Sequence, residues 1–437
     1  MYLLATIIGK ISKFLLKLIH RGGSLPGEIV LRINKDFLKH LKYPKDIILV
    51  TGTNGKSTVT NLTYRILSNS GKKVICNLAG NNLKMGAVSL LLDNMSLTGK
   101  VQGDVLLLEV DELSMPRIME DITPNYIVIN NFFRDQLDRA GEMENIVRKI
   151  EGCVKDYSGT LILNGDDPSV VRIALAANGA KVYYYGFEEY EGSVKQTTEA
   201  SEGRFCPVCG KPIEYDYYQY SHIGRFHHDN HFGNYDIDYL GSVVSVNEGK
   251  YCVNGEQFNS PYRALYAFYN ELATISIAKL FNVSYDVIHS SIESFKMNNG
   301  RMEQYSLKNG KECVLNLAKN PAGFNESLKF IIQSNKPCVV GLVLNDLEAD
   351  GQDVSWIYDA QMEILCNSNI EEVVTCGTRY LDMALRMEYA GYQGKIVPIL
   401  DYDEFVAYFN AQAKDVFVVA NYTSLQLTRA ALKRGSL

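Results

Sequence analysis

Residues 51–58, Thr-Gly-Thr-Asn-Gly-Lys-Ser-Thr, constrain the fold of this chain more than any other segment. The short apolar run at 46–50 precedes them, and residues 59–67 space their apolar side chains as a helix does. A glycine loop between a strand and a helix lets backbone N–H groups surround phosphate oxygens. The segment therefore predicts a phosphate-binding loop that takes a nucleoside triphosphate, with a purely structural glycine turn as the alternative.

The side chains of this loop have the chemistry that a triphosphate needs. Lys56 supplies a positive charge, and the hydroxyl of Ser57 or Thr58 can bind Mg²⁺. Val50 stands where the strict pattern has glycine, so the loop is a variant. The predicted nucleotide-binding residues of the loop are Thr53, Asn54, Gly55, Lys56, Ser57 and Thr58.

The composition is that of a globular protein with substantial cores. Of the 437 residues, 46% are hydrophobic and 22% are charged, and the length predicts two or three domains. The net charge of −6 gives no indication of nucleic acid as the main partner. Nine cysteines, mostly scattered, and a nucleotide loop favour the reducing cytosol, so we expect a cytoplasmic protein.

Residues 1–45 form a predicted N-terminal helical segment. Three lysines, Lys10, Lys13 and Lys17, lie opposite an apolar helical face made of Leu3, Leu4, Ile7, Ile8, Ile11, Phe14, Leu15 and Leu18. The lysines interrupt the apolar run and no small-residue cleavage site follows, which argues against a membrane span and against a signal peptide. Two alternatives stay open: a helix that lies on an anionic membrane surface, and a helix packed on its own domain.

Continuous apolar runs in the next part of the chain predict a parallel sheet covered on both faces. These runs alternate with helical stretches and occupy residues 74–76, 105–109, 126–130 and 160–164. We expect a central α/β domain at 46–298, in which residues 200–236 are an insertion rich in tyrosine, histidine and glycine. A boundary near Asn298 starts a second, smaller α/β domain at 299–437, predicted to be Rossmann-like.

Polar side chains at predicted strand ends are candidates for metal and phosphate contacts. Glu109, in the segment Glu-Val-Asp-Glu at 109–112, can reach Mg²⁺ from the carboxyl end of its strand, with a helix N-cap as the alternative. Asn131, Asp135 and Asp138 follow the next strand and could hold metal or position phosphate. The segment Asn-Gly-Asp-Asp at 164–167 ends another strand, where an Asn-Gly turn is the alternative.

The predicted domain boundary carries one more candidate. In the segment Gly-Arg-Met-Glu at 300–303, Arg301 could neutralise a transferring phosphoryl group, or could be only a solvated linker residue.

These segments, with Tyr269-Asn270, resemble the ATP-dependent Mur ligase superfamily, which includes folylpolyglutamate synthetase. The resemblance covers the chain from about residue 45 onward and implies that Lys56 and the loop hydroxyl bind ATP and Mg²⁺. It also implies that Glu109 binds Mg²⁺ and that Asn270 lies by the adenine. Members of this superfamily phosphorylate a substrate carboxylate to an acyl phosphate, which an amine then attacks.

Three features separate the chain from the muramyl ligases. About 45 residues precede the loop, too few for a domain that grips a uridine nucleotide, and Gln136 stands where those ligases usually carry histidine. Residues 319–326 and 350–359 resemble the C-terminal domain of the MurT family, the synthetase subunits of lipid II isoglutaminyl synthase. The resemblance implies ATP-dependent amidation of the α-carboxylate of D-glutamate in lipid II to D-isoglutamine, in peptidoglycan biosynthesis at the inner face of the cell membrane.

No cysteine of this chain stands in a glycine-flanked nucleophile turn, so a partner must supply ammonia. In the MurT family the partner is GatD, a glutaminase-like subunit, which implies a heterodimer. The resemblance further implies that an aspartate, Asp350 or Asp353, completes the partner's Cys-His pair, with helix capping as the alternative for Asp353. Two other functions stay open: a stand-alone ligase that joins an amino acid to a carboxylate, and a nucleotide-binding scaffold without catalysis.

Cys206 and Cys209 have the spacing of a zinc knuckle, which is half of a site. MurT proteins typically carry a second Cys-x-x-Cys pair, and here His228 and His231 keep its two-residue spacing. We therefore expect a structural zinc ribbon with two cysteine and two histidine ligands. His227 in place of His228, or a lost site, are the alternatives.

Overall fold

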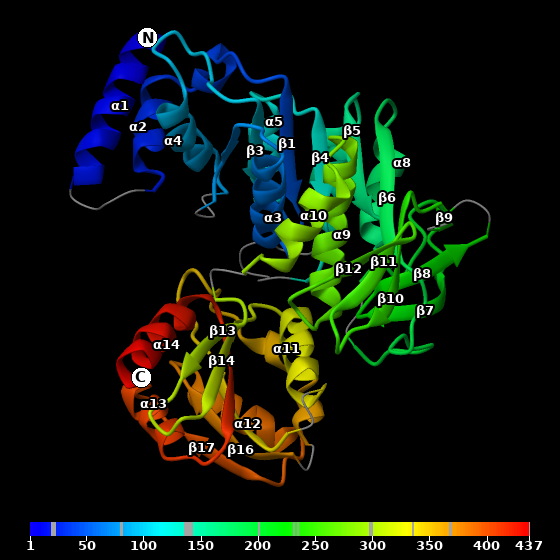
Figure 1. Cartoon of the computed structure of the whole chain (residues 1–437), viewed down its shortest axis with the longest axis vertical. Coiled ribbons are helices and arrows are strands. Elements are labelled where there is room, and N and C mark those ends of the chain that lie inside the picture. The colour runs from blue at the N-terminus through cyan, green and yellow to red at the C-terminus, as the bar shows by residue number, and fades with distance from the viewer. Residues whose placement is uncertain are drawn as a thin grey trace. The chain divides into compact units, whose positions relative to one another are not determined.

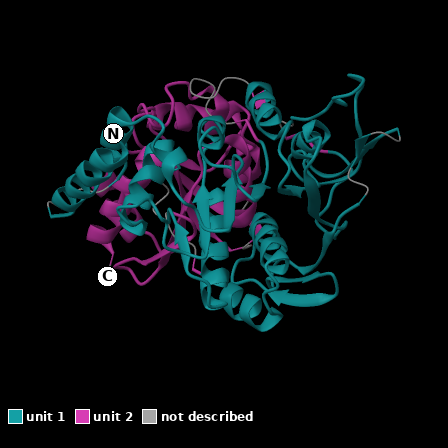
Figure 2. Ribbon diagram, turned by 90° about the horizontal axis from the view of Figure 1, so that it is seen from above, with its two compact units in different colours: residues 1–132, 144–196, 202–295 teal, residues 133–143, 197–201, 296–437 magenta. Residues whose placement is uncertain are grey.

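The structure is a computed structural model that describes residues 1–18, 23–78, 82–134, 143–199, 202–229, 232–233, 236–296, 300–333, 336–366 and 369–436. The predicted residues Asp135, Gln136, Asp138 and His231 lie outside these ranges. The chain divides into two compact units (Figure 2). Unit 1 comprises Met1–Phe132, Glu144–Gln196 and Glu202–Phe295, and unit 2 comprises Phe133–Met143, Thr197–Ser201 and Lys296–Leu437.

A nine-stranded sheet in the order β12-β11-β10-β6-β5-β4-β1-β3-β2 organises unit 1. Its strands are β1 (Asp46–Thr51), β2 (Val74–Cys76), β3 (Val105–Glu109), β4 (Tyr126–Ile129), β5 (Thr160–Asn164), β6 (Lys181–Phe187), β10 (Tyr239–Ser245), β11 (Lys250–Val253) and β12 (Glu256–Asn259). In this spatial order, neighbouring strands from β10 across to β2 pair in parallel. The strands β10, β11 and β12 form an antiparallel edge. Every residue of β3 is buried, as expected of a strand covered on both faces.

Some helices of unit 1 pack on this sheet, and an N-terminal group packs mainly on its own members (Figure 1). The described helices of unit 1 are α1 (Tyr2–Leu18), α2 (Leu25–Ile33), η1 (Phe37–His40), α3 (Lys56–Asn69), α4 (Lys84–Asn94), α5 (Met115–Met119), α7 (Met143–Val154), α8 (Pro168–Ala176), α9 (Leu265–Leu280) and α10 (Tyr285–Glu293). The helix α3 begins directly after the predicted loop and packs on β1, β3 and the long helix α9. In the described part of the chain, no helix has both the length and the apolarity needed to cross a bilayer.

A small three-stranded antiparallel sheet falls in the segment that the sequence marks as an insertion. Its strands are β7 (Glu214–Tyr220), β8 (Ile223–His228) and β9 (Phe232–Gly233). A separate hydrophobic cluster supports it, made of Val171, Cys206, Ile213, Phe226 and Phe232. Because Val171 belongs to α8, this cluster fastens the small sheet to the main body of unit 1.

A six-stranded sheet in the order β13-β14-β18-β15-β16-β17 forms the centre of unit 2. Its elements are β13 (Glu303–Ser306), β14 (Glu312–Leu317), α11 (Pro321–Gln333), β15 (Cys338–Val343), η2 (Ser355–Tyr358), η3 (Met362–Leu365), β16 (Ile370–Cys376), α12 (Tyr380–Tyr389), β17 (Lys395–Pro398), α13 (Tyr402–Asn410), β18 (Asp415–Ala420) and α14 (Tyr422–Gly435). All pairs except β13–β14 are parallel. One core cluster joins the sheet to α11 and α12, and a second joins it to α13 and α14, so helices cover both faces.

Candidate active site

The loop between β1 and α3 depends on two glycines. Gly52 and Gly55 have φ angles of 125° and 84°, in the region that only glycine adopts at low cost. A Cβ atom on Gly55 would lie 2.0 Å from Oδ1 of Asn270, so the buried Asn270 side chain packs directly against the loop. The structure thus brings together Gly55 and Asn270, which are far apart in the sequence.

Two asparagines after β4 hold the backbone of this loop. The backbone N–H of Asn54 donates to Oδ1 of Asn131 at 2.8 Å, and that of Thr53 donates to the Asn131 carbonyl at 2.8 Å. The amide groups of Asn130 and Asn131 both donate to the Asn54 carbonyl, at 3.3 and 3.2 Å. Asn131, predicted to contact metal or phosphate, therefore has a demonstrable role in fixing the loop.

Lys56 begins α3 and its ammonium group is buried. Its Nζ donates to the Gly52 carbonyl, to the Thr53 carbonyl at 3.2 Å, and to Oε2 of Glu112 at 3.1 Å. Burial by itself would lower the pKa of the Lys56 ammonium. The negative charge of Glu112, followed by that of Glu109 and Asp111, outweighs burial and raises this pKa, so the lysine is charged.

Three buried acids lie at the end of β3: Glu109 is its last residue, and Asp111 and Glu112 follow it. Asn77, at the end of β2, exchanges two hydrogen bonds of 2.8 and 2.9 Å with the backbone of Glu109 and so fixes its position. Sequence reasoning selected Glu109 from this group but missed the ion pair of Glu112 and the support from Asn77. The position of Asn77 immediately after a strand was the available signal.

The residues around the loop fit a magnesium triphosphate. A charged lysine, hydroxyl groups at Ser57 and Thr58, and buried carboxylates are present together, and Thr58 is buried while Ser57 is half-buried. Oδ1 of Asn130 is buried and has no hydrogen-bond donor among the described residues. Because an acceptor oxygen does not bond to a phosphate oxygen, a cation or a water molecule beside the phosphates would satisfy it.

The Asn-Gly-Asp-Asp segment at the end of β5 has a structural role. Asp167 caps α8 through the backbone N–H groups of Ser169 and Val170, and its other oxygen accepts from the Phe132 backbone at 2.8 Å. Asp166 accepts from the Tyr269 hydroxyl at 2.6 Å. These contacts hold the chain after β4 and the helix α9, which carry Asn131 and Asn270, in register with β5.

Arg301 lies in unit 2 on a tightly held turn. Gly300 has a φ of 84° and donates its N–H to Oε1 of Glu303 at 2.8 Å. Arg429 of α14 binds both oxygens of Glu303, at 2.7 and 3.0 Å, and Tyr305 donates to the same carboxylate. Burial would raise the pKa of Glu303, but the hydrogen bonds from Arg429 outweigh it and lower the pKa. These contacts fix the turn that carries the half-buried Arg301.

The two aspartates of segment 350–353 have different surroundings. Asp350 is buried, and its oxygens accept from the Thr423 backbone N–H at 2.8 Å and from the Thr423 hydroxyl. Burial raises the pKa of Asp350 even though these hydrogen bonds oppose the shift. Asp353 is exposed and accepts from the Ser355 N–H at 2.8 Å at the start of η2, and hydrogen bonding by the side chain and then the backbone of Ser355 lowers its pKa.

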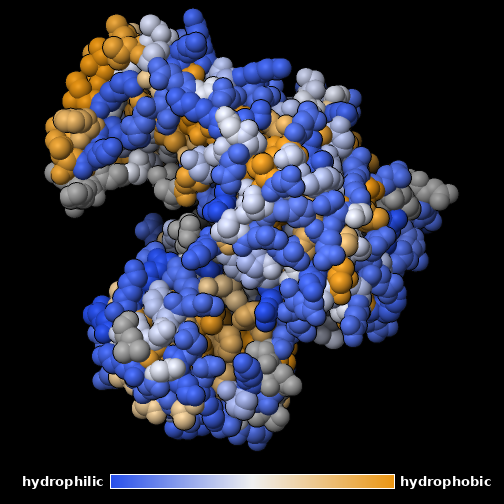
Figure 3. Space-filling model, viewed as in Figure 1, coloured by the Kyte–Doolittle hydropathy of each residue, from blue (hydrophilic) through white to orange (hydrophobic). Residues whose placement is uncertain are grey.

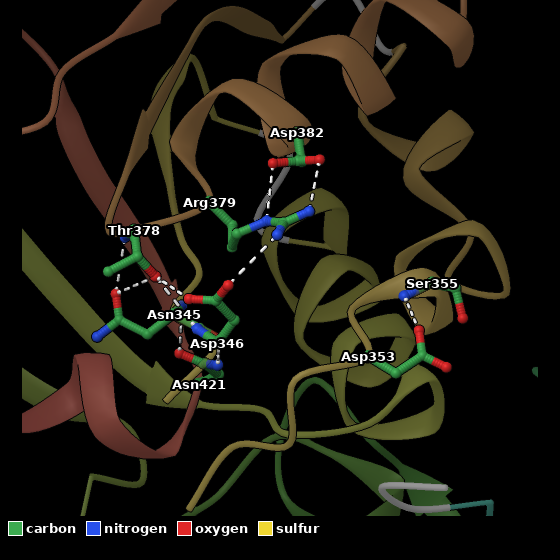
Figure 4. A network of polar contacts seen from close by, with 8 residues as sticks. All are labelled: Asn345, Asp346, Asp353, Ser355, Thr378, Arg379, Asp382 and Asn421. Carbon is green, nitrogen blue, oxygen red and sulfur yellow. Dashed lines mark hydrogen bonds and ion pairs between the residues drawn. The ribbon is translucent and has the colours of Figure 1, made fainter. Parts of the chain in front are cut away.

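A polar network lies where β15, β16 and β18 end (Figure 4). Asp346 accepts from the Thr378 hydroxyl at 2.8 Å and from Nη1 of Arg379 at 3.3 Å. Asn345 and Asn421 exchange hydrogen bonds of 2.7 and 3.0 Å, and Asn345 also donates to Thr423. Through Asn345 the network reaches Thr423, which holds Asp350. Asp353 stands apart from the network in Figure 4.

Three of the four predicted zinc ligands lie together. One ligand atom from each of Cys206, Cys209 and His228 falls within 4.8 Å of the others, and Sγ of Cys209 is 3.1 Å from Nε2 of His228. His227 instead lies 3.6 Å from oxygens of both Glu214 and Asp216. Of the two histidines weighed for this position, His228 is the one beside the thiols.

Comparison with known proteins places the chain among ligases. Residues 50–233 match the Mur ligase middle domain, and residues 317–425 match the MurT ligase C-terminal domain. The subunit MurT of lipid II isoglutaminyl synthase (glutamine-hydrolyzing) from Staphylococcus aureus strain COL is 36% identical, over 93% of this chain and 91% of its own. The chain belongs to the MurT family. The MurT subunit from Streptococcus pneumoniae strain R6 is 31% identical, over 97% of this chain and 95% of its own.

Solved structures agree on the fold of this MurT family member. A pseudomurein peptide ligase type C from Methanothermus fervidus has a TM-score of 0.66 at 20% identity, over 92% of this chain and 81% of its own. A folylpolyglutamate synthase from Thermotoga maritima has a TM-score of 0.58 at 15% identity, over 97% and 96%. The predicted Mur ligase-like α/β fold is thus confirmed.

Proposed function

We propose that this chain is the ATP-dependent synthetase subunit of a lipid II isoglutaminyl synthase, acting in peptidoglycan biosynthesis. The observation that carries the proposal is the complete loop, with its charged Lys56 and the buried acids at the end of β3, in a chain related over nine-tenths of its length to MurT subunits. The substrate is the α-carboxylate of D-glutamate in lipid II, and the product is D-isoglutamine.

The reaction needs an activated carboxylate because a free carboxylate does not react with ammonia at neutral pH. A carboxylate oxygen of the substrate attacks the γ-phosphorus of ATP, the bond to ADP breaks, and an acyl phosphate forms. Ammonia then attacks the acyl carbon, phosphate leaves, and the nitrogen loses a proton. Lys56 and Arg301 would stabilise the phosphoryl charge, and Asn270 would lie by the adenine. Mg²⁺, held by Ser57 and Glu109, would neutralise phosphate charge.

Ammonia would come from a GatD-like glutaminase subunit, with Asp350 orienting the histidine of the partner's Cys-His pair. The aspartate of such a triad is buried and fixed by hydrogen bonds. Asp350 is held by the backbone N–H and the hydroxyl of Thr423, whereas Asp353 accepts from the Ser355 N–H at the start of η2. Since the substrate is lipid-linked, the enzyme would act in the cytoplasm at the inner face of the cell membrane.

A structural zinc ion would be held by Cys206, Cys209, His228 and His231. The first three residues already converge, and thiolates with neutral imidazoles are suitable ligands for zinc. Four protein ligands would leave no open position, so the ion would stabilise the small sheet and take no part in catalysis.

Reconstitution tests the main proposal. The chain is co-expressed with a candidate glutaminase and given ATP, glutamine and lipid II, and amidated lipid II is measured by mass spectrometry. We expect Lys56→Ala to lower the rate by at least about 100-fold, and the exposed Lys336→Ala to leave it unchanged. Failure to amidate lipid II with a stably bound partner would contradict the proposal.

The same assay separates the two other functions. Consumption of an amino acid as the acceptor by the pure chain, without a partner, would favour a stand-alone ligase. An unchanged rate in Lys56→Ala would favour a scaffold.

A further inference from the structure

The first helix packs on the protein through the side opposite its apolar face. The buried residues of α1 are Ala5, Thr6 and Gly9, which are small. Large apolar side chains of the same helix are 40–63% exposed: Leu3, Leu4, Ile7, Ile11, Phe14, Leu15 and Leu18. At about 100° per residue these seven fall within an arc of about 120°. In Figure 3 they form the apolar patch over α1.

The contacts beneath α1 fix this orientation. A Cβ atom on Gly9 would lie 2.4 Å from Val30 of α2 and 3.0 Å from Leu92 of α4, so the helix approaches both neighbours closely. Lys10 donates to the Leu92 carbonyl and to the Met95 carbonyl at 2.8 Å, at the end of α4. Lys13 donates to the Ser89 carbonyl and pairs with Asp93 at 2.7 Å. Rotation of the helix to bury its apolar face would break all of these contacts.

The charges of the helix favour one kind of occupant for the exposed face. Residues 2–18 contain no acid, and the exposed Lys17 borders the apolar arc. An exposed apolar stripe with adjacent positive charge matches a membrane surface, where apolar side chains enter the acyl boundary and lysine meets anionic headgroups. With 17 residues, α1 would lie about 25 Å along such a surface.

We propose that the apolar face of α1 attaches the protein to the anionic membrane surface that carries its substrate. This rests on the proposed function, because a lipid-linked carboxylate can be reached only at that surface. This proposal combines the two alternatives that the sequence left open for residues 1–18, a membrane-surface helix and a helix packed on its own domain. One side of the helix docks on α2 and α4, and the other meets lipid.

Vesicle co-sedimentation tests this attachment. Full-length protein is mixed with vesicles of equal parts phosphatidylglycerol and phosphatidylethanolamine, and the bound fraction is measured. The double variant Ile11→Glu, Phe14→Glu changes only exposed positions and should bind at least tenfold more weakly. The matched control Leu381→Glu, Leu385→Glu replaces two exposed leucines of α12 and should bind as the unchanged protein does.

An activity measurement separates this proposal from the proposed function. With the partner present, the α1 variant should lose activity on lipid II in vesicles and keep activity on a short-chain, water-soluble analogue. Inactivity of the unchanged protein on both substrates would contradict the proposed function alone. Equal vesicle binding by variant and unchanged protein would overturn the membrane proposal. The membrane proposal would also be overturned if the unchanged protein formed a dimer or a partner complex and the α1 variant did not. The apolar face would then be a protein interface.

Discussion

Individual side chains decide whether the loop of this protein can accept a nucleotide. Gly55 has a left-handed φ, and its missing Cβ leaves room for the amide of Asn270. Any larger residue would have to displace either the loop or Asn270. The glycine was identifiable from sequence because its spacing from Lys56 is fixed, whereas the contact with Asn270 depends on how α9 packs.

Gly55→Ala should therefore lower catalysis strongly while the protein stays folded. An alanine in this conformation costs about 1–2 kcal/mol, and the displaced loop should lower kcat/KM on the order of 100-fold. Gly71→Ala is the matched control, because Gly71 has a φ of 89° and nothing lies within 4 Å of its Cβ position. Measured nucleotide affinity and amidation rates should fall only in the first variant; equal losses in both would contradict the prediction.

At the scale of the element, α9 contains a buried acid that makes stability depend on pH. Glu271 accepts hydrogen bonds from Ser260 at 2.7 Å and from Tyr251 at 2.8 Å. Burial raises its pKa to about 7, against the effect of these hydrogen bonds. In the unfolded chain the carboxyl has an ordinary pKa of about 4.3.

Between about pH 4.5 and 7 the unfolded chain loses this proton and the folded chain keeps it, so the free energy of unfolding falls as pH rises. Glu271→Gln cannot ionise and should gain stability relative to the unchanged protein from pH 5 to pH 8, by at most about 3 kcal/mol. Thermal unfolding at the two pH values measures this. The exposed Glu191→Gln should show no such gain, and a parallel pH response in both variants would refute the assignment.

The small sheet of β7, β8 and β9 should depend on zinc. We expect one zinc ion per chain, a lower unfolding temperature after chelation, and loss of zinc in Cys209→Ser. Cys366→Ser, at an exposed cysteine outside the cluster, should keep its zinc. The zinc content of the purified protein measures this. The prediction would be contradicted if the protein without substitutions contained no zinc and its unfolding temperature did not change on chelation.

Strands and helices were more predictable than their contacts. The runs 74–76, 105–109 and 160–164 coincide with β2, β3 and β5, because a buried strand needs a continuous apolar sequence. The orientation of α1 was not predictable, since periodicity defines an apolar face but does not say which face is buried. The pairing of Lys56 with Glu112 was hidden because three acids lie within four residues.

At the scale of the whole molecule, the candidate residues are divided between the two units. Lys56, Glu109 and Asn270 belong to unit 1, and Arg301 and Asp350 belong to unit 2. The sequence predicted a second domain at 299–437, whereas unit 2 comprises Lys296–Leu437 together with Phe133–Met143 and Thr197–Ser201. It could not separate Asp350 from Asp353, because burial and the bond to Thr423 depend on how the sheet and α14 pack.

Asp350→Asn should separate the two nitrogen sources. If Asp350 serves the glutaminase, the complex of this variant should lose glutamine-driven amidation by at least about 100-fold and keep most of the ammonium-driven rate. Asp353→Asn should lower neither rate by more than a few-fold. Both rates are measured with the partner bound. Loss of ammonium-driven amidation in Asp350→Asn would show that this residue serves the synthetase site or the fold instead.

The last helix of the chain, α14, contacts both candidate segments of unit 2. Thr423, in its first turn, holds Asp350, and Arg429, about 9 Å further along the axis, holds the turn of Arg301 through Glu303. Because both contacts lie on α14, a shift of this helix along its axis would move both. Docking of a partner against Asp350 would thus be felt at Arg301, a mechanical route by which ammonia release and carboxylate activation could be synchronised.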